Sequence, residues 1–377
     1  MSKYLTSSNK NLKKYYLIAG EASGDLHGGN LIKALKNKNP HTDCRCWGGD
    51  YMQAAGGTLV KHIKDLAFMG FWEVAQNIRT ILGNFKLCKQ DILEYQPDAL
   101  ILIDYPGFNL KIAAWAKEQG FQVFYYISPQ IWAWKENRIH QIKKSVDQMF
   151  VILPFEKDYY KKHDFEVTYV GHPLLDVTTS FIPSPDFITR NNLSDKPIIA
   201  ILPGSRKQEV ERMLPTMISV QQDFPDYQFV IAGAPALPLS YYHEIIKRKD
   251  ISIIQNDTYS LLSHADAALV ASGTATLETA LFKVPQIVCY KGSYITYRIA
   301  KTFVKIKYLS LVNLILDQPL VKELIQQECT PENIQLSLSE LLQKENSAAL
   351  RKAYNQLIQL LGNKGAAERV AAEILNF

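Results

Sequence analysis

The chain has 377 residues, of which 47% are hydrophobic and 21% charged, and its formal net charge is +5. This length predicts two domains with sizeable cores, and the small charge excess does not indicate a nucleic-acid-binding protein. No apolar stretch reaches the ~18 residues of a membrane span, and no signal-peptide core follows the polar N-terminus, so we expect a cytoplasmic protein. The five cysteines lack the spacing of a zinc site, so we expect reduced thiols, no metal and no cofactor.

Strand-like and helix-like segments alternate along the chain. Short apolar runs predict parallel strands covered on both faces. They lie at Tyr15–Ala19, Ala99–Ile103, Gln122–Ile127, Gln148–Ile152 and Val167–Val170, and again at Ile198–Leu202, Gln228–Ala232, Ile251–Ile254, Ala267–Ala271 and Gln286–Tyr290. The proline-containing segment 180–187 predicts a linker. We therefore predict an α/β protein with two Rossmann-like, doubly wound domains, 1–180 and 181–377, facing each other across a cleft. Whether the last helices pack back on the first domain stays open.

A glycine-rich segment follows the first strand, with Gly20, Gly24 and Gly28 spaced G-x₃-G-x₃-G. This spacing matches neither the dinucleotide-binding fingerprint nor the P-loop. We expect a loop here that carries carboxylates and suits sugar hydroxyls better than a diphosphate. The candidate acceptor-binding residues are Glu21, Ser23, Gly24 and Asp25.

Asp104 ends the buried strand Ala99–Ile103 and is a candidate general base. An acid at the carboxyl end of such a strand points toward the ligand side of the sheet, and partial burial raises its pKa. The alternative is an Asx turn or a helix cap. His27 is a second candidate base near the glycine-rich segment, and its alternative is a packed core histidine.

In the second half, the segment after Ile198–Leu202 predicts a helix start with a capping box formed by Ser205 and Gln208. Arg206 would then add a full positive charge to a helix N-terminus, which suits a diphosphate. The alternative is an ordinary capped helix with a solvated arginine.

A second helix start follows Ala267–Ala271, where Gly273 and Thr274 offer backbone and hydroxyl donors to phosphate oxygens. Glu278 could accept hydrogen bonds from a ribose diol, or could be a helix-start glutamate that the dipole favours. Asn313 lies in an apolar context, where it could bind the nucleotide or satisfy a loop.

Apolar side chains that a single helical stripe does not explain lie at Leu66, Phe68, Met69 and Trp72. They could form an interfacial membrane patch, and the alternative is core packing.

Several segments, in order and with consistent spacing from about residue 15 to 340, resemble lipid-A-disaccharide synthases. They are AGEASGDLHG (19–28), MGFWEV (69–74), IDYPGFN (103–109), YYISPQIWAWKENRI (125–139), VGHPLLD (170–176), LPGSRKQEV (202–210), ASGTATLE (271–278) and LVNLILDQPLVKELIQQECTPENI (311–334).

The resemblance implies the GT-B fold and an inverting, metal-independent glycosyl transfer in lipid A and lipopolysaccharide biosynthesis. UDP-2,3-diacylglucosamine would react with 2,3-diacylglucosamine 1-phosphate to give a β-1,6-linked disaccharide 1-phosphate and UDP. It also implies a peripheral protein on the inner face of the inner membrane, which strengthens the membrane-patch hypothesis. A homodimer is compatible with the sequence, which does not specify an oligomeric state.

The resemblance places Arg206, Glu278 and Asn313 on UDP-site motifs and Asp104 on the candidate base. The family pattern I-D-x-P-D-F-N has a second aspartate where this chain has Gly107, so Asp104 is the only acid of the motif. In an in-line displacement, Asp104 would take the proton of the acceptor hydroxyl, while Arg206 and the helix-start amides would stabilise the leaving UDP. Two other classes remain open: a UDP-sugar 2-epimerase with the same two-domain plan, and a membrane-bound nucleotide-sugar-binding protein without activity.

Overall fold

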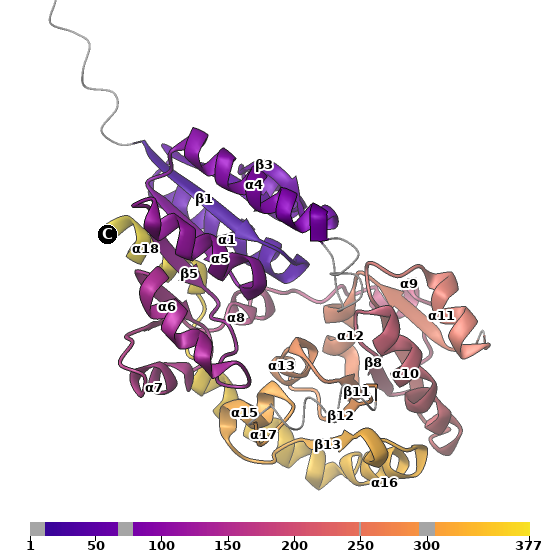
Figure 1. The fold of residues 1–377 in the computed structure, drawn as a ribbon. Helices are drawn as coiled ribbons and strands as arrows, with labels where there is room; N and C mark the ends of the chain where they lie inside the picture. The colour runs from indigo at the N-terminus through magenta and orange to yellow at the C-terminus, as the bar shows by residue number, and fades with distance from the viewer. Residues whose placement is uncertain (1–11, 67–77, 249, 294–305) are drawn as a thin grey trace, which may run out of the picture. The chain divides into compact units, whose positions relative to one another are not determined.

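The computed structural model describes residues 12–66, 78–248, 250–293 and 306–377 (Figure 1). The chain divides into two compact units. Unit 1 comprises Met1–Pro173 and Asn363–Phe377, and unit 2 comprises Leu174–Gly362. Each unit is built on one parallel β-sheet, as expected for a chain in which buried strands alternate with helices.

The sheet of unit 1 has seven strands in the order β3-β2-β1-β4-β5-β6-β7. The strands are β1 (Lys13–Ala19), β2 (Thr42–Gly48), β3 (Thr58–His62), β4 (Ala99–Ile103), β5 (Gln122–Tyr126), β6 (Gln148–Val151) and β7 (Thr168–Tyr169). The helices of this unit are α1 (Ala22–Lys38), α2 (Asp50–Ala54), α4 (Ile78–Tyr95), α5 (Pro106–Glu118), α6 (Ile139–Ser145), α7 (Glu156–Lys161) and α18 (Ala366–Asn376).

The sheet of unit 2 has six strands in the order β10-β9-β8-β11-β12-β13. The strands are β8 (Ile198–Leu202), β9 (Gln228–Gly233), β10 (Ser252–Gln255), β11 (Ala265–Ala271), β12 (Gln286–Tyr290) and β13 (Lys322–Ile325). The helices are α8 (Leu174–Thr178), α9 (Phe187–Arg190), α10 (Lys207–Ile218), α11 (Leu239–Ile246), α12 (Thr258–His264), α13 (Thr274–Leu281), α15 (Leu311–Leu316), α16 (Pro331–Leu341) and α17 (Lys344–Leu361).

Both sheets are doubly wound in the same way, which confirms the predicted fold class. In each sheet the first strand lies in the interior, and the winding reverses between it and the fourth strand of that sheet. These topological switch points are the pairs β1/β4 and β8/β11. In open α/β sheets, ligands bind beyond the carboxyl ends of the strands at such a switch point. The fold therefore marks one candidate binding region in each unit.

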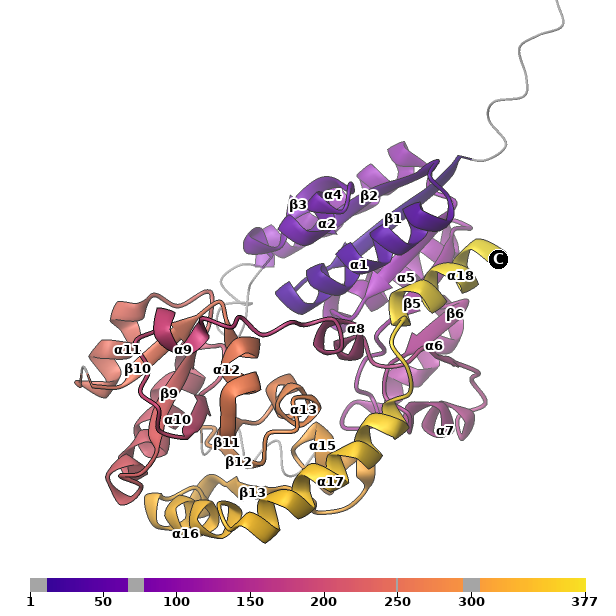
Figure 2. The same ribbon diagram turned by 180° about the vertical axis from the view of Figure 1, so that it is seen from behind.

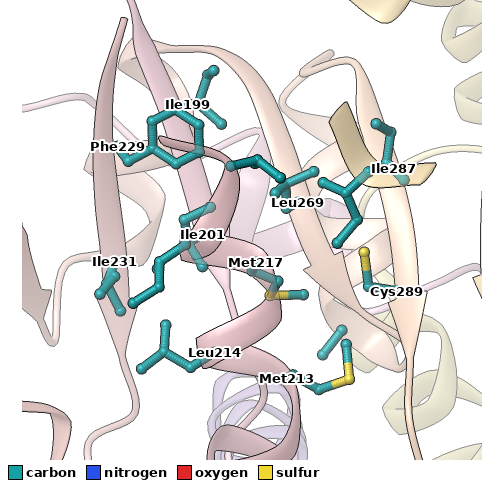
Figure 3. Close-up of a cluster of buried hydrophobic side chains, with 14 of the residues drawn as sticks. Ile199, Ile201, Met213, Leu214, Met217, Phe229, Ile231, Leu269, Ile287 and Cys289 are labelled. Atoms are coloured by element: carbon teal, nitrogen blue, oxygen red, sulfur yellow. The ribbon is translucent and has the colours of Figure 1, made fainter. Parts of the chain in front are cut away.

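Side chains from both faces of each sheet are buried. In β8, Ile199 and Ile201 pack on one face, whereas Ile198, Ala200 and Leu202 pack on the other. Figure 3 shows the first of these clusters, where side chains of β8, β9, β11 and β12 meet the methionines of α10. Burial on both faces explains why these strands read as continuous apolar runs in the sequence.

The boundary between the units and the place of the last helix differ from a simple division at residue 180. Unit 2 begins at Leu174, because α8 packs against α13. Helix α18 belongs to unit 1, where it packs along α1 (Figure 2). Val370, Ala371 and Ile374 join the core of unit 1, and the Arg369 Nε–H group donates to the Val170 carbonyl at 2.8 Å.

The proposed membrane patch lies mostly outside the described residues, which omit Phe68, Met69 and Trp72. Leu66 is described and is only 3% exposed, because it packs in the core of unit 1. Its side chain therefore matches the core-packing alternative. None of the helices in the described part of the chain has the length and apolar character that crossing a membrane requires.

Candidate functional site

The switch point of unit 1 brings the end of β1 against the end of β4. The two strands pair in parallel from Tyr15 with Ala99 to Ala19 with Ile103, so the segments that follow them are neighbours. Gly20 lies directly against the Tyr105 side chain, and a Cβ at this position would be 2.2 Å from the Tyr105 Cγ atom. Gly20 is therefore required for this close approach.

Asp104 lies at this switch point in an uncommon backbone conformation. Its φ angle is +45°, and that of Tyr105 is +49°. The Asp104 carbonyl accepts hydrogen bonds from the Tyr125 hydroxyl at 2.6 Å and from Asn109 Nδ2 at 2.8 Å, while its N–H group donates to the Tyr126 carbonyl at 3.0 Å. Left-handed non-glycine residues cluster at functional sites, where surrounding contacts hold them in place. These contacts identify Tyr125 and Asn109 as supports of the candidate base, which the sequence did not reveal.

The surroundings of Asp104 raise the pKa of its carboxyl group toward neutrality. Burial and the negative charge of Glu21 raise the pKa of the Asp104 carboxyl to about 6, whereas a hydrogen bond from the Tyr105 N–H group opposes this shift. A general base works best when its pKa lies near the operating pH. Position 107 is a glycine and adds no second acid. A Cβ at this position would meet nothing within 4 Å, so a clash does not explain the glycine. The geometry and the charge state both suit Asp104 as a base.

The segment expected to be an acidic glycine loop is largely helical. Helix α1 begins at Ala22, so Ser23, Gly24 and Asp25 lie in its first turn, and the helix continues beyond Gly28. The glycines allow close packing, since a Cβ at Gly24 would lie 3.1 Å from the Ala19 Cβ atom and one at Gly28 would lie 2.7 Å from Met52 Sδ. The expectation of a loop here is wrong, because helix packing, and not turn conformation, requires these glycines.

Asp25 has a structural role in place of the expected contact with acceptor hydroxyls. It is only 3% exposed, and its carboxylate accepts backbone hydrogen bonds from Gly49 at 2.7 Å, Met52 at 3.0 Å and Tyr51 at 3.1 Å. These donors lie at the N-terminus of α2, from its N-cap Gly49 onward, where N–H groups have no partners within the helix. Glu21 and Ser23 are exposed and remain candidates for acceptor binding.

Replacing Asp25 with alanine should therefore destabilise unit 1. The substitution leaves three backbone N–H groups without their acceptor, two of them in buried hydrogen bonds, and we expect it to lower the free energy of unfolding by about 2–4 kcal/mol. Urea denaturation followed by circular dichroism measures the change. Asp50→Ala is the matched control, because Asp50 is exposed in the first turn of the same helix. Equal stabilities of the two variants would contradict the capping role.

His27 is a poorer candidate base than Asp104. It is 9% exposed on α1, and burial lowers the pKa of its imidazole to about 4. The Nδ1 atom has no hydrogen-bond partner in the structure. His172 lies near enough to interact with it electrostatically, and burial followed by the His27 charge lowers the pKa of His172 to about 3. A neutral buried imidazole of this kind accepts a proton less readily at neutral pH than Asp104 does.

At the switch point of unit 2, Arg206 immediately precedes helix α10, which begins at Lys207. Arg206 is the N-cap residue, and the carboxylate of Glu209, the third residue of the helix, accepts from the backbone N–H groups of Ser205 at 3.1 Å and Arg206 at 3.3 Å. The predicted capping box of Ser205 and Gln208 is therefore wrong by one residue. The Arg206 side chain is 58% exposed and lies 3.7 Å from Glu209, so its guanidinium group is accessible to a ligand.

The second helix start of unit 2 follows β11, the strand that pairs with β8. Gly273 has a φ angle of +154°, and the exposed Thr274 begins α13. Because β8 and β11 are neighbours, the N-termini of α10 and α13 both face the carboxyl edge of the sheet at the switch point. Two helix N-termini and one arginine provide a setting for a diphosphate.

Glu278 lies one turn into α13 and is partly buried. Its Oε1 atom accepts a hydrogen bond from the Tyr259 hydroxyl at 2.8 Å. Burial raises the pKa of the Glu278 carboxyl, and the bond from Tyr259 opposes the shift. This carboxylate has remaining acceptor capacity for ligand hydroxyls, and Tyr259 is its support, which the sequence did not indicate.

Asn313 matches the structural alternative, and not the expected nucleotide contact. It is 1% exposed, and its side chain exchanges hydrogen bonds with the Val321 backbone, both at 2.9 Å. Its Nδ2 atom also donates to Glu323 Oε1 at 2.9 Å, and Glu323 accepts in turn from the Leu309 and Ser310 N–H groups. Asn313 therefore fastens α15 to β13. No cluster of His, Cys, Asp or Glu suited to a metal ion occurs among the residues that the structure describes.

Comparison with known proteins identifies the family to which this chain is similar. A family model described as "Lipid-A-disaccharide synthetase" matches residues 15–375. Lipid-A-disaccharide synthase of Syntrophus aciditrophicus (strain SB) is 39% identical over 374 residues, which cover 97% of this chain and 98% of the relative. The corresponding protein of Coxiella burnetii (strain CbuG_Q212) is 38% identical over 370 residues, with 97% and 98% covered.

Solved structures of lower sequence identity share the fold. UDP-GlcNAc 2-epimerase from Neisseria meningitidis, bound to UDP-GlcNAc, aligns with a TM-score of 0.65 at 12% identity over 97% of this chain and 100% of that one. The glycosyltransferase of kitacinnamycin aligns with a TM-score of 0.65 at 12% identity, over 97% and 99%. At these identities the likeness concerns the fold alone, which glycosyltransferases and epimerases have in common.

Proposed function

Because this chain is a glycosyltransferase of the lipid-A-disaccharide synthase family, we propose that it joins two acylated glucosamines. The donor is UDP-2,3-diacylglucosamine and the acceptor is 2,3-diacylglucosamine 1-phosphate. The products are a β-1,6-linked disaccharide 1-phosphate and UDP. A UDP-sugar 2-epimerase remains the second candidate, and it is supported only by structural similarity.

The observation that carries this proposal is the opposite character of the two switch points. In unit 1, Asp104 and Glu21 place two carboxyl groups beyond β4 and β1. In unit 2, Arg206 and two helix N-termini lie beyond β8 and β11. A nucleotide diphosphate favours the second environment, and a sugar hydroxyl that must lose a proton favours the first.

The proposed mechanism is a single in-line displacement with inversion. The Asp104 carboxylate takes the proton of the acceptor 6-hydroxyl as its oxygen bonds to the anomeric carbon of the donor. The bond between that carbon and the diphosphate oxygen breaks, and the electron pair leaves with UDP. Arg206 and the amides that begin α10 and α13 stabilise the negative charge that develops on the diphosphate. Glu278 is proposed to bind the ribose hydroxyls.

We also propose that the reaction takes place at the inner face of the inner membrane. Both substrates carry acyl chains, whose apolar surface is unfavourable in water. The segment with Phe68, Met69 and Trp72 is the candidate for contact with this surface.

The direct test supplies purified protein with both diacyl sugars in detergent micelles. Mass spectrometry should detect the disaccharide 1-phosphate only when both are present, with one UDP released per disaccharide. A parallel reaction contains UDP-GlcNAc without acceptor. Epimerisation of UDP-GlcNAc at C2 without any disaccharide from the two diacyl sugars would favour the epimerase. Binding without turnover in either reaction would indicate a nucleotide-sugar-binding protein.

The pH dependence of the reaction should report the ionisation of Asp104. Since the carboxylate is the active form, kcat/KM is expected to fall as the pH drops below about 6, the pKa that burial and Glu21 give to this carboxyl group. Glu21→Gln removes one negative charge and so lowers the Asp104 pKa, which should move the acid limb of the profile to lower pH. An acid limb that stays in place would contradict the assignment.

A further inference from the structure

The segment that follows β5 carries chemistry that the proposed mechanism does not use. Strand β5 pairs with β4, so residues 127–138 leave the sheet at the same carboxyl edge as Asp104. The segment reads ISPQIWAWKENR and ends in the short helix Glu136–Arg138. Its position beside the candidate base raises the question of which part of the acceptor it contacts.

A buried carboxylate holds this segment in place. Glu156, at the start of α7, is 1% exposed and accepts hydrogen bonds from the Ser128 hydroxyl at 2.5 Å and Trp132 Nε1 at 3.2 Å. It also accepts from the Leu153 N–H group at 2.9 Å. Burial raises the pKa of Glu156, and these donors oppose the shift. The segment is thus fastened to the core of unit 1 at both Ser128 and Trp132.

Beyond this anchor, two cations share one exposed aromatic ring. Trp134 is 44% exposed, with Lys135 Nζ 4.3 Å and Arg138 Cζ 5.6 Å from its ring centroid. Lys135 also has a φ angle of +56°. Partial burial, and then the charge of Arg138, lower the pKa of the Lys135 ammonium group. The two like charges are therefore close enough to repel each other.

Glu136 lies between the two cations in sequence, and its Oε1 atom is 3.3 Å from His163 Nε2. Contact with one aromatic ring offsets only part of the repulsion, because a cation–π contact at an exposed site is worth about 0.5–1 kcal/mol. A bound dianion would interact favourably with both cations.

The cation pair is electrostatically connected with the candidate base. Arg138 lies near enough to Tyr125 for its charge to oppose the burial that raises the Tyr125 pKa. The Tyr125 hydroxyl in turn donates to the Asp104 carbonyl at 2.6 Å. Arg138 and Asp104 therefore both act electrostatically on the same tyrosine at the carboxyl edge of the unit 1 sheet.

We propose that Lys135 and Arg138, on either side of Trp134, bind the 1-phosphate of the acceptor sugar. This inference rests on the proposed function, which supplies an acceptor with a phosphate monoester. Arginine and lysine are the side chains that bind phosphate most strongly, arginine through paired N–H groups. The subsite would orient the acceptor from its C1 end, and it predicts selectivity for the phosphorylated sugar.

The test compares the wild-type protein with the double variant Lys135→Ala/Arg138→Ala in detergent micelles. We expect KM for the phosphorylated acceptor to rise on the order of 10- to 100-fold, because two solvent-exposed hydrogen bonds are lost and each is worth roughly three- to tenfold in affinity. The KM for the UDP-sugar donor should stay within about twofold, because the donor loses no hydrogen bond in this variant. The acceptor without its phosphate, measured as a substrate or as a competing ligand, should bind both proteins equally.

The matched control is Lys143→Ala/Lys144→Ala, which removes the same charge from exposed positions on the next helix, α6. It should leave every KM unchanged. Lys135→Arg/Arg138→Lys keeps both charges and should restore most of the acceptor affinity. An unchanged midpoint temperature of thermal unfolding for each variant shows that the fold is intact.

Several outcomes would overturn the inference. One is an unchanged KM of the double variant for the phosphorylated acceptor. Another is an equal loss of affinity for the acceptors with and without the phosphate. A further arm measures sedimentation with phosphatidylglycerol and phosphatidylcholine vesicles. If the double variant loses binding to the anionic vesicles but keeps its preference for the phosphorylated acceptor, the pair contacts lipid head groups and the inference is wrong. Failure of the wild-type protein to form any disaccharide would instead reject the proposed function itself.

Discussion

Asp104→Asn is expected to lower kcat by roughly 10²- to 10⁴-fold, the contribution typical of a general base. The amide cannot take the proton of the acceptor hydroxyl, but it has nearly the same shape as the carboxyl group. Asparagine also adopts the left-handed conformation more readily than most residues, so the φ angle of +45° should persist. The measurement is turnover of both diacyl sugars, together with UDP affinity by calorimetry.

The affinity for UDP should not change in this variant, because the proposed nucleotide site belongs to unit 2. Asp158→Asn is a suitable control, since Asp158 is exposed on α7 of the same unit. A rate within about threefold of the wild-type rate would remove Asp104 from the role of base. His27→Asn would then be the next variant to examine, since it changes the other candidate.

Arg206→Ala is expected to produce the second large effect, a fall in kcat of roughly 10²- to 10³-fold. The guanidinium group is proposed to stabilise the charge on the leaving diphosphate, which is greatest in the transition state. Since the Arg206 side chain is 58% exposed, its removal should change the unfolding free energy by less than about 0.5 kcal/mol. Steady-state kinetics and urea denaturation measure the two quantities.

The control for Arg206 is Arg212→Ala, an exposed arginine on the same helix α10. It removes an equal charge without a place at the helix N-terminus, and its kinetics should match those of the wild-type protein. If both substitutions lower the rate equally, Arg206 acts only through the net charge of unit 2. If neither does, the diphosphate is bound elsewhere.

Strand prediction succeeded where the pattern was strongest. Each strand predicted from an apolar run is present, with ends that differ by at most two residues. Strands β2, β3 and β13 were missed. β2 alternates polar and apolar residues in the order TDCRCWG, and β3 and β13 are edge strands with few buried side chains. The prediction relied on burial on both faces, a signal that these strands lack.

The candidate residues fall into two groups. Asp104 directly follows the buried strand β4, and Arg206 lies in the short segment between β8 and α10. Both were identifiable because the carboxyl edge of a parallel sheet is where ligands bind. Asp25 was assigned to acceptor binding because a carboxylate in a glycine-rich segment suits sugar hydroxyls, and Asn313 was assigned to the UDP site because the family resemblance places it there. In the structure both side chains have hydrogen-bond partners within the protein, at Gly49–Met52 and at Val321–Glu323.

The order of buried runs and helices in the chain was enough to establish the fold class, and the motifs were enough to indicate the family. Both are encoded locally, by periodicity and by short contiguous segments. The electrostatic setting of Asp104 depends on Glu21, which lies far away in sequence and becomes a neighbour only through the pairing of β1 with β4. The same is true of the donors from which the Asp25 and Glu156 carboxyl groups accept hydrogen bonds. Which polar residues stabilise the fold, and which remain available to a substrate, therefore depends on contacts that exist only in the folded chain.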